Sequence, residues 1–476
     1  MGGRRRKARV ARRPSPVERR FFHAAFKGSG EKPETRGIRT RDPGFRHRAE
    51  RTPRGAREDG RRGGMRRKKR FTMVIPSYWG RRSGEPFNEE DAVYDHPTPL
   101  DGEGTLARAL ESVRLLRHRD FRVVVLGVAT HPGLEAEVGE KLRGITAPFK
   151  KHYPLALLTH GHEEELRRVL AEKGKEGHAR FVSLRGYSNI RNFCLIAAHI
   201  TGAEAAVLFD DDQVYEDPYY LEKVEQNIGE EREGGLVLGI AGYYVNPDGG
   251  YRVPPNRDPV MTEWPAIECM NRAFDIIEGG ERLKRTPWVF GGNMAIHRDL
   301  FKRVAFDPLV ARGEDIDYLV NAKFLGHHFK LDNTLWIKHL PPPKTSPLWR
   351  RFREDLDRFI YSREKLRRQE PVDEGTGRVS VEELDPYPGR FLRDDLEDLI
   401  FRTCVLMATR YLSQGDARGY EECMNNILRA RSPEWMPENP FLHYMEWRRG
   451  WEDFMREAED IPGLRAVVEE AFDDRG

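Results

Sequence analysis

The chain has 476 residues, which is long enough for a large core and for more than one domain, and its formal net charge is +4. The charge is uneven: residues 1–70 hold 26 basic and 7 acidic residues, so the rest of the chain is acidic, with 55 basic and 70 acidic residues. No apolar run approaches the roughly 20 residues that span a bilayer, so we expect no transmembrane helix. The basic start lacks the apolar segment of a secretory signal, so we expect no signal peptide.

Cysteine use favours a reducing compartment. The four cysteines are far apart and form no CxxC pair, which argues against a disulfide framework and against a cysteine-based zinc site. They are Cys194, Cys269, Cys404 and Cys423. Together with the absence of a membrane-spanning run, this spacing predicts a cytoplasmic protein.

Residues 1–68 form a basic tail rich in Arg, Gly and Pro and poor in aliphatic residues. Such a segment buries too little apolar surface to offset its ordering entropy, so we expect it to be disordered. One interpretation is that the tail binds nucleic acid or an anionic membrane. The other, which we favour, is an extension without function, with the folded protein beginning at Met65 or Met73. We therefore expect no nucleic-acid partner.

Hydrophobic periodicity predicts alternating strands and helices after the tail. The first strand is expected over residues 71–75, where an apolar run stops at Pro76, and the β-branched run 121–129 predicts a parallel strand covered on both faces. In chain order, the other expected elements are helices over 104–118 and 163–174, a strand over 179–184, a helix over 188–203, a strand over 205–209, a helix over 217–229, strands over 236–245 and 288–296, and a helix over 314–326. Ser188 is the expected N-cap of the helix that it begins, and Gly326 ends the last helix.

This alternation predicts an α/β fold with an open, doubly wound sheet, in which ligands bind at the carboxyl ends of the strands. The pattern then changes, and residues 346–368 and 391–431 are predicted to form amphipathic helices joined by a polar linker near 372–378. We therefore expect a sheet domain over 69–345 and a helical C-terminal region over 346–476, which either covers the ligand site or forms a homodimer contact.

Three consecutive carboxylates, Asp210, Asp211 and Asp212, directly follow a predicted buried strand. On an extended segment alternate side chains face the same way, so Asp210 and Asp212 would converge while Asp211 points elsewhere. Close carboxylates repel, and a hard divalent cation removes that penalty. The alternative is a solvated acidic turn before a helix that Asp217 caps and Pro218 opens. Because the triplet follows a buried strand, we favour the cation site.

Over residues 71–340 the sequence resembles the GT-A-fold glycosyltransferases, most closely the inverting family 2 group. The motifs that carry this resemblance occur in the order VIPSYWG, SNIRN, FDDDQ, VFGGNMAIHRDLF and RGEDIDYLVNAKFLGHHF. The resemblance implies a Rossmann-like, mixed but mostly parallel sheet flanked by helices, with a helical C-terminal extension. It also implies a hexosyltransferase that uses Mn²⁺ or Mg²⁺ and moves a sugar from a UDP- or GDP-sugar to an acceptor hydroxyl.

The resemblance implies roles for the first strand and for the acidic triplet, which matches the DxD motif. Pro76 and Tyr78 would border the nucleotide base. Asp212 would bind the metal, Asp210 would bind the metal or the donor ribose, and Asp211 would contact the donor. The chemistry agrees, because a divalent cation neutralises the charge that develops on a departing diphosphate.

Arg191 and Asn192 open the helix before the metal strand and are implied to contact the donor, since a guanidinium suits phosphate or base recognition. The alternative for Arg191 is a solvated helix face. His339 follows the last predicted strand, where several GT-A enzymes use a histidine as a further metal ligand, and imidazole suits Mn²⁺. The alternative is a surface histidine before a proline run.

The glycine motif offers further donor contacts. Gly291 and Gly292 permit close backbone approach to a sugar or diphosphate. Asn293 is expected to hydrogen-bond a substrate. Trp288 either stacks on a sugar ring or belongs to the core.

The sequence RGEDID supplies the expected catalytic carboxylates. Inversion needs a base that takes the proton of the acceptor hydroxyl, and the family pattern implies Asp315 as this base and Glu314 as the group that holds the acceptor. Asp317 is expected to be solvent-facing or to be a charge at the helix N-terminus. The alternative for all three is an ordinary acidic first helical turn.

Three other functions stay open. Retaining GT-A enzymes share these motifs. A sugar nucleotidyltransferase shares the nucleotide-binding architecture, but it predicts a Gly-rich basic loop after the first strand, which residues 76–86 match only faintly. A nucleic-acid-binding protein would use the basic tail, and the acidic body argues against it.

Overall fold

The computed structural model describes residues 68–86, 88, 90–255, 257–343, 346–373 and 375–473. The predictions for the basic tail therefore concern residues 1–67, which lie outside the described residues.

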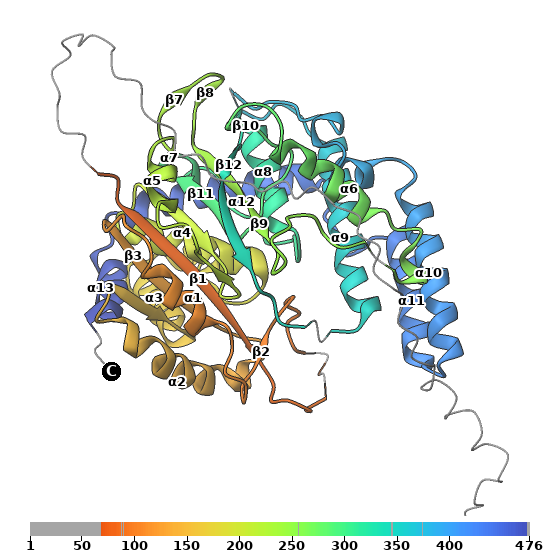
Figure 1. Ribbon diagram of the computed structural model, residues 1–476, viewed down its shortest axis with the longest axis horizontal. Coiled ribbons are helices and arrows are strands. Elements are labelled where there is room, and N and C mark those ends of the chain that lie inside the picture. Colours follow the sequence, from red (N-terminus) through yellow and green to blue (C-terminus); the bar gives the residue numbers. More distant parts are fainter. Residues whose placement is uncertain are drawn as a thin grey trace, which may run out of the picture. The chain divides into compact units, whose positions relative to one another are not determined.

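A mixed sheet forms the centre of the described chain, with helices on both faces (Figure 1). Its strands are β1 (Phe71–Gly80), β2 (Thr98–Pro99), β3 (Phe121–Ala129), β4 (Leu155–Leu158), β5 (Ala205–Phe209), β6 (Gln213–Val214), β9 (Gly239–Val245), β10 (Leu283–Arg285), β11 (Asn293–His297) and β12 (Lys330–His339). The order is β10-β12-β9-β11-β5-β1-β3-β4, with β2 beside β1 and β6 beside β12. The pairs β4–β3, β3–β1, β1–β5 and β9–β12 are parallel, whereas β11 is antiparallel to β5 and β9.

The helices are α1 (Leu106–Val113), α2 (Glu135–Thr146), α3 (His160–Glu172), α4 (Tyr187–Ile200), α5 (Tyr220–Glu225), α6 (Ala266–Ala273), α7 (Arg298–Phe301), α8 (Glu314–Phe324), α9 (Leu348–Arg367), α10 (Leu396–Ser413), α11 (Ala417–Arg431), α12 (Pro440–Ala458) and α13 (Pro462–Asp473). Helices cover both faces of the sheet, but α10 and α11 pack on each other and on α9 instead (Figure 1). Within the described ranges, no helix combines the length and apolar character needed to cross a membrane. The predicted α/β class with a helical C-terminal region is confirmed.

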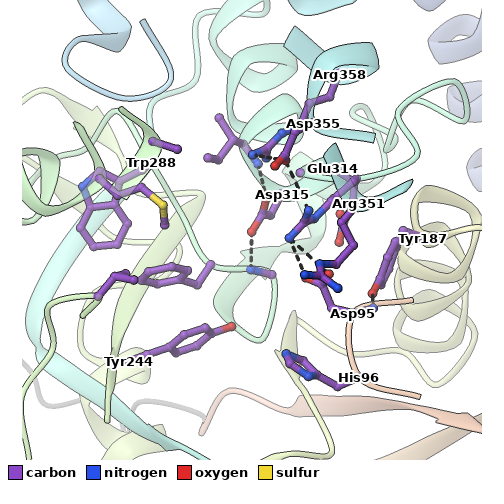
Figure 2. Close-up of a pocket in the computed structure, with 18 of the residues that line it drawn as sticks. Asp95, His96, Tyr187, Tyr244, Trp288, Glu314, Asp315, Arg351, Asp355 and Arg358 are labelled. Atoms are coloured by element: carbon purple, nitrogen blue, oxygen red, sulfur yellow. Dashed lines mark hydrogen bonds and ion pairs between the residues drawn. The ribbon is translucent and has the colours of Figure 1, made fainter. Parts of the chain in front are cut away.

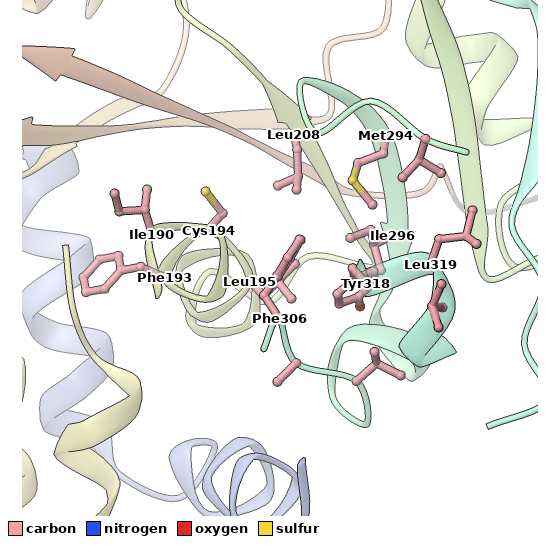
Figure 3. Close-up of a cluster of buried hydrophobic side chains, with 14 of the residues drawn as sticks. Ile190, Phe193, Cys194, Leu195, Leu208, Met294, Ile296, Phe306, Tyr318 and Leu319 are labelled. Atoms are coloured by element: carbon pink, nitrogen blue, oxygen red, sulfur yellow. The ribbon is translucent and has the colours of Figure 1, made fainter. Parts of the chain in front are cut away.

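Strand β1 shows why both faces are covered. Its alternate side chains enter two separate cores: Met73 and Ile75 join the cluster under α1 and α2, and Val74 joins the cluster that contains α4. Figure 3 shows part of the second cluster, where Leu195 of α4 lies near Leu208 of β5. The burial of both faces explains the continuous apolar runs of the sequence.

Some predicted elements differ from the structure. Strand β1 continues past Pro76 to Gly80, and this proline is tolerated because β5 pairs with β1 only as far as Val74. The strand predicted over 179–184 is wrong: a 3₁₀ helix spans Glu176–Phe181. A tertiary contact accompanies this conformation, since the Phe181 ring stacks on Phe454 of α12.

Two predicted helix caps are also wrong. Gly186, with φ +85°, precedes α4, and the Ser188 hydroxyl lies inside the helix and donates to the Val310 carbonyl. Helix α5 begins only at Tyr220, and Asp217 instead pairs with Lys223 at 2.6 Å. The strand predicted over 288–296 begins only at Asn293.

A buried ion cluster connects the C-terminal helices to the sheet region. Lys365 of α9 lies 2.8 Å from Asp307 and 2.7 Å from Asp317 of α8, and all three side chains are at most 3% exposed. The Tyr361 hydroxyl also donates to Asp307. Asp317 is therefore in the first turn of α8, as expected, but the expectation that it faces solvent is wrong.

We predict that Lys365→Met lowers the free energy of unfolding by about 3–5 kcal/mol, because it leaves two buried carboxylates without their cation. Urea denaturation checks this. Arg168→Met is the matched control, since Arg168 pairs with Glu172 on the surface of α3, and its loss should cost less than about 1 kcal/mol. Equal losses in both variants would contradict the prediction.

Candidate active site

A cavity of about 520 Å³ lies where several strands end and α8 begins. Tyr78 near the end of β1, Asp210 after β5 and His339 at the end of β12 all line it. Glu314 and Asp315, the first two residues of α8, line the same cavity (Figure 2). Motifs far apart in the sequence are therefore brought to one place.

Arg191 joins the two acidic parts of this cavity. Its guanidinium is 4% exposed, with Nη1 2.9 Å from Asp210 Oδ1, and Nε donates to Glu314 Oε1 at 3.2 Å. Burial opposes the charge of Arg191, but Asp210 and Glu314 raise its pKa well above the ordinary value, so it stays charged. A solvated helix face, the alternative for this residue, is wrong.

Glu314 and Asp315 are both held by neighbouring groups. Burial, with a contribution from the Asp315 charge, raises the pKa of Glu314 to about 7 although Arg191 opposes the change. Asp315 accepts hydrogen bonds from the Gly291 N–H at 2.9 Å and the Ile316 N–H at 2.8 Å. Burial raises the pKa of Asp315 in spite of these bonds. Both carboxyls are thus better proton acceptors than exposed ones.

The acidic triplet does not follow the predicted alternation. The chain leaves the extended conformation after Phe209, and the Gln213 N–H donates to the Asp210 carbonyl across a tight turn. All three carboxylates line the cavity. Asp211 accepts a 2.6 Å hydrogen bond from the Ser77 hydroxyl, and burial, followed by the Asp212 charge, raises its pKa well above the ordinary value.

Asp212 and His339 form the pair best suited to a cation. Their Oδ2 and Nε2 atoms are 3.3 Å apart, and the His339 ring packs on Tyr244 with centroids 4.8 Å apart. In the described part of the chain, no group of three or more His, Cys, Asp or Glu side chains could hold a metal. A hard cation could still bind this oxygen and nitrogen, with positions left for phosphate and water. Asp210 lines the same cavity, but its Oδ1 is already ion-paired with Arg191 Nη1 at 2.9 Å, so Asp212 and His339 are the better-suited ligands.

The two glycines approach protein side chains closely. A Cβ on Gly291 would lie 2.7 Å from Arg191 Nη2, and a Cβ on Gly292 would collide with Gln213 and Asp210. Trp288 both lines the cavity and belongs to the core: it is 1% exposed and its indole N–H donates to the Ala273 carbonyl.

Four predicted donor contacts do not line the cavity, and one of them is Gly292, whose N–H donates to the Tyr244 hydroxyl. Asn192 is fully buried and exchanges two hydrogen bonds with the backbone of Phe306. Asn293 is fully buried between the Tyr243 carbonyl and the Tyr220 hydroxyl. Pro76 is buried within β1.

Other residues of the cavity wall were not predicted from the sequence. One of them is Tyr187, whose ring centroid lies 5.5 Å from that of the predicted residue Tyr78. Behind the wall, Tyr94 packs on Tyr78 at 4.5 Å. On another part of the wall lie charged residues from two loops and α9: Asp95, Arg312, Arg351, Asp355 and Arg358. The only sequence signal for this wall is the i, i+4, i+7 spacing of the last three, which places them on one face of α9.

No protein-family model matches the sequence, and no curated protein matches it. Among solved structures, the chain is similar to the mannosyltransferase PcManGT from Pyrobaculum calidifontis in complex with GDP-Man and Mn²⁺, at 14% identity and a TM-score of 0.41, over 82% of this chain and 86% of that chain. It is also similar to glucosyl-3-phosphoglycerate synthase from Mycobacterium tuberculosis in complex with Mn²⁺, UDP and phosphoglyceric acid, at 14% identity and a TM-score of 0.32, over 61% of this chain and 76% of that chain. These similarities assign no residue of this chain a role.

We predict that Glu314→Gln changes how stability depends on pH. Between about pH 4.5 and 7 the folded state keeps a proton on Glu314 that the unfolded state has lost, so this group lowers wild-type stability as the pH rises. The variant lacks the effect. Its stability relative to wild type should rise across this window, by on the order of 3 kcal/mol, and level off above pH 7. Urea unfolding at pH 5, 6, 7 and 8 measures the difference, and a constant difference would contradict the prediction.

Proposed function

We propose that this chain is a metal-dependent glycosyltransferase that moves a sugar from a UDP- or GDP-sugar to an acceptor hydroxyl with inversion. The observation that carries the proposal is the presence, in one cavity, of the Asp212–His339 pair and of the Glu314–Asp315 pair, with Arg191 between Asp210 and Glu314. The order of the sequence motifs supports the same function.

The donor side is assigned to the ends of β1, β5 and β12. A divalent cation bound by Asp212 and His339 would neutralise the charge that develops on the leaving diphosphate. Tyr78 and its aromatic neighbours at the end of β1 offer faces for the nucleotide base. Trp288 offers an apolar wall for the sugar.

The acceptor side is assigned to the start of α8. Asp315 takes the proton of the acceptor hydroxyl as its oxygen attacks the anomeric carbon. The hydrogen bonds from Gly291 and Ile316 fix the orientation of this carboxylate, and its raised pKa favours proton transfer near neutral pH. Glu314 positions the acceptor, and Arg191 fixes Glu314.

A hydrolysis screen of nucleotide-sugars with and without Mn²⁺ or Mg²⁺ tests the activity. We predict that wild-type enzyme hydrolyses at least one donor only with metal, and that Asp212→Asn abolishes this activity while the folded state survives, as judged by circular dichroism. Glu216→Gln is the control, because Glu216 is 46% exposed and pairs with Lys338. Full activity in Asp212→Asn, or turnover of no donor by folded wild type, would refute the metal role.

The stereochemistry is tested separately. We predict that Asp315→Asn lowers kcat by about 10²–10⁴-fold, because it removes the base, while the affinity for the donor is unchanged. NMR of the first-formed product should show the inverted anomer in the wild type. A retained anomer would show that Asp315 is not the base of an inverting reaction and would favour the retaining alternative.

A further inference from the structure

We propose that the acceptor carries an anionic group, a carboxylate or a phosphate, and that Arg351 of α9 binds it. That the bound anion belongs to an acceptor rests on the proposed function, whereas the binding of an anion by Arg351 does not. The argument begins with the charges on the wall of the cavity formed by α9 and the loops before α8 and after β1.

The charges on this wall do not cancel. Arg312 lies 3.2 Å from Asp95 and 3.4 Å from Asp355, and Arg358 lies 2.9 Å from Asp355. The two carboxylates therefore neutralise the charges of these two guanidiniums. Arg351 lines the same cavity but makes no direct ion pair with a carboxylate among the described residues, although Asp95 and Asp355 are close enough to act on its charge. Three guanidiniums therefore share two carboxylates, and Arg351 is the one without a direct salt bridge.

The surroundings of Arg351 support this conclusion. Its guanidinium donates to the backbone carbonyl of Ser346, which carries no charge. Burial and then the charge of Arg312 lower the pKa of Arg351, and the charges of Asp95 and Asp355 offset this only in part, so the cation is incompletely compensated. Glu354, next along α9, does not compensate, because burial raises its pKa to about 8 and it is mostly protonated near neutral pH.

The wall adjoins the carboxylates of α8. Gly313, with φ +70°, precedes Glu314, and a Cβ there would collide with the Arg358 guanidinium. The absence of a side chain at Gly313 therefore lets Arg358 lie directly against the start of α8. Arg358 Nε is buried and has no hydrogen-bond partner. Figure 2 shows Arg351, Asp355 and Arg358 beside Glu314 and Asp315, with Trp288 and Tyr244 across the cavity.

This arrangement separates two anion positions. The donor diphosphate is assigned to the Asp212–His339 pair, where a cation would hold it. A group held by Arg351 lies on the wall next to Asp315, the assigned base. Guanidinium binds carboxylate or phosphate through paired N–H donors, so the acceptor would be fixed at its anionic end while a hydroxyl reaches Asp315.

Calorimetric titration of the protein with inorganic phosphate, in the absence of metal and donor, tests the site. We expect the wild type to bind phosphate and Arg351→Gln to lower the affinity for phosphate at least about 30-fold. Arg367→Gln is the matched control on the same helix, since Arg367 is 42% exposed and pairs with Glu364, and it should bind like wild type. Arg351→Lys keeps the charge and should recover part of the affinity, which separates charge recognition from a folding defect. Equal binding by wild type and Arg351→Gln would overturn the proposal.

Competition by three compounds with one carbon skeleton identifies the anion. Glyceric acid or glycerol phosphate should displace inorganic phosphate, and the stronger competitor tells carboxylate from phosphate, while glycerol should not compete. Competition by glycerol at the same concentration would overturn the proposal. The affinities for UDP and GDP with Mn²⁺ should be unchanged in Arg351→Gln. A loss of nucleotide affinity as large as the loss of phosphate affinity would overturn the proposal, because it would place Arg351 in the donor site. Failure of metal-dependent hydrolysis would instead refute the proposed function and leave the phosphate result standing.

Discussion

The candidate site depends on one buried cation. Asp210 follows β5, and Glu314 is the first residue of α8. The guanidinium of Arg191 forms an ion pair with each of them and so connects the two acidic groups of the cavity. Without it, the buried carboxylate of Glu314 would have no counter-charge among the described residues, and unpaired charge in the interior is penalised by several kcal/mol. Arg191 belongs to the first turns of α4, and this helix is almost entirely buried. The position of Asp210 relative to Glu314 is therefore set by a helix buried in the core.

The glycine pair makes this arrangement possible. Arg191, Gln213 and Asp210 occupy the space that side chains at Gly291 and Gly292 would need. The same backbone turns its N–H groups outward, toward Asp315 and toward the Tyr244 hydroxyl. One short stretch before β11 thus provides room for the buried cation and orients the assigned base.

Much of the fold could be predicted because strands buried on both faces and amphipathic helices leave clear periodic patterns. The same patterns failed where a tertiary contact accompanies the conformation, as at Phe181, which packs on α12. Motif order identified the carboxylates of the cavity, but it could not separate donor contacts from residues such as Asn192, whose amide satisfies the backbone of a distant loop. The wall with Arg351 went unpredicted because a helical pattern shows which residues share a face and does not show what that face meets.

The Lys365 cluster restricts how this architecture could be shortened. Asp307 and Asp317 lie in the part of the chain that carries the sheet, and among the described residues the buried cation that pairs with both is Lys365 of α9. A version of the chain that ended after β12 would contain two buried carboxylates without a cation to pair with. Trimming, whether by an engineer or by natural selection, would require coordinated replacement of all three positions by apolar residues, since each single replacement leaves an unbalanced charge. The helical region is in this sense an integral part of the fold and cannot be removed one residue at a time.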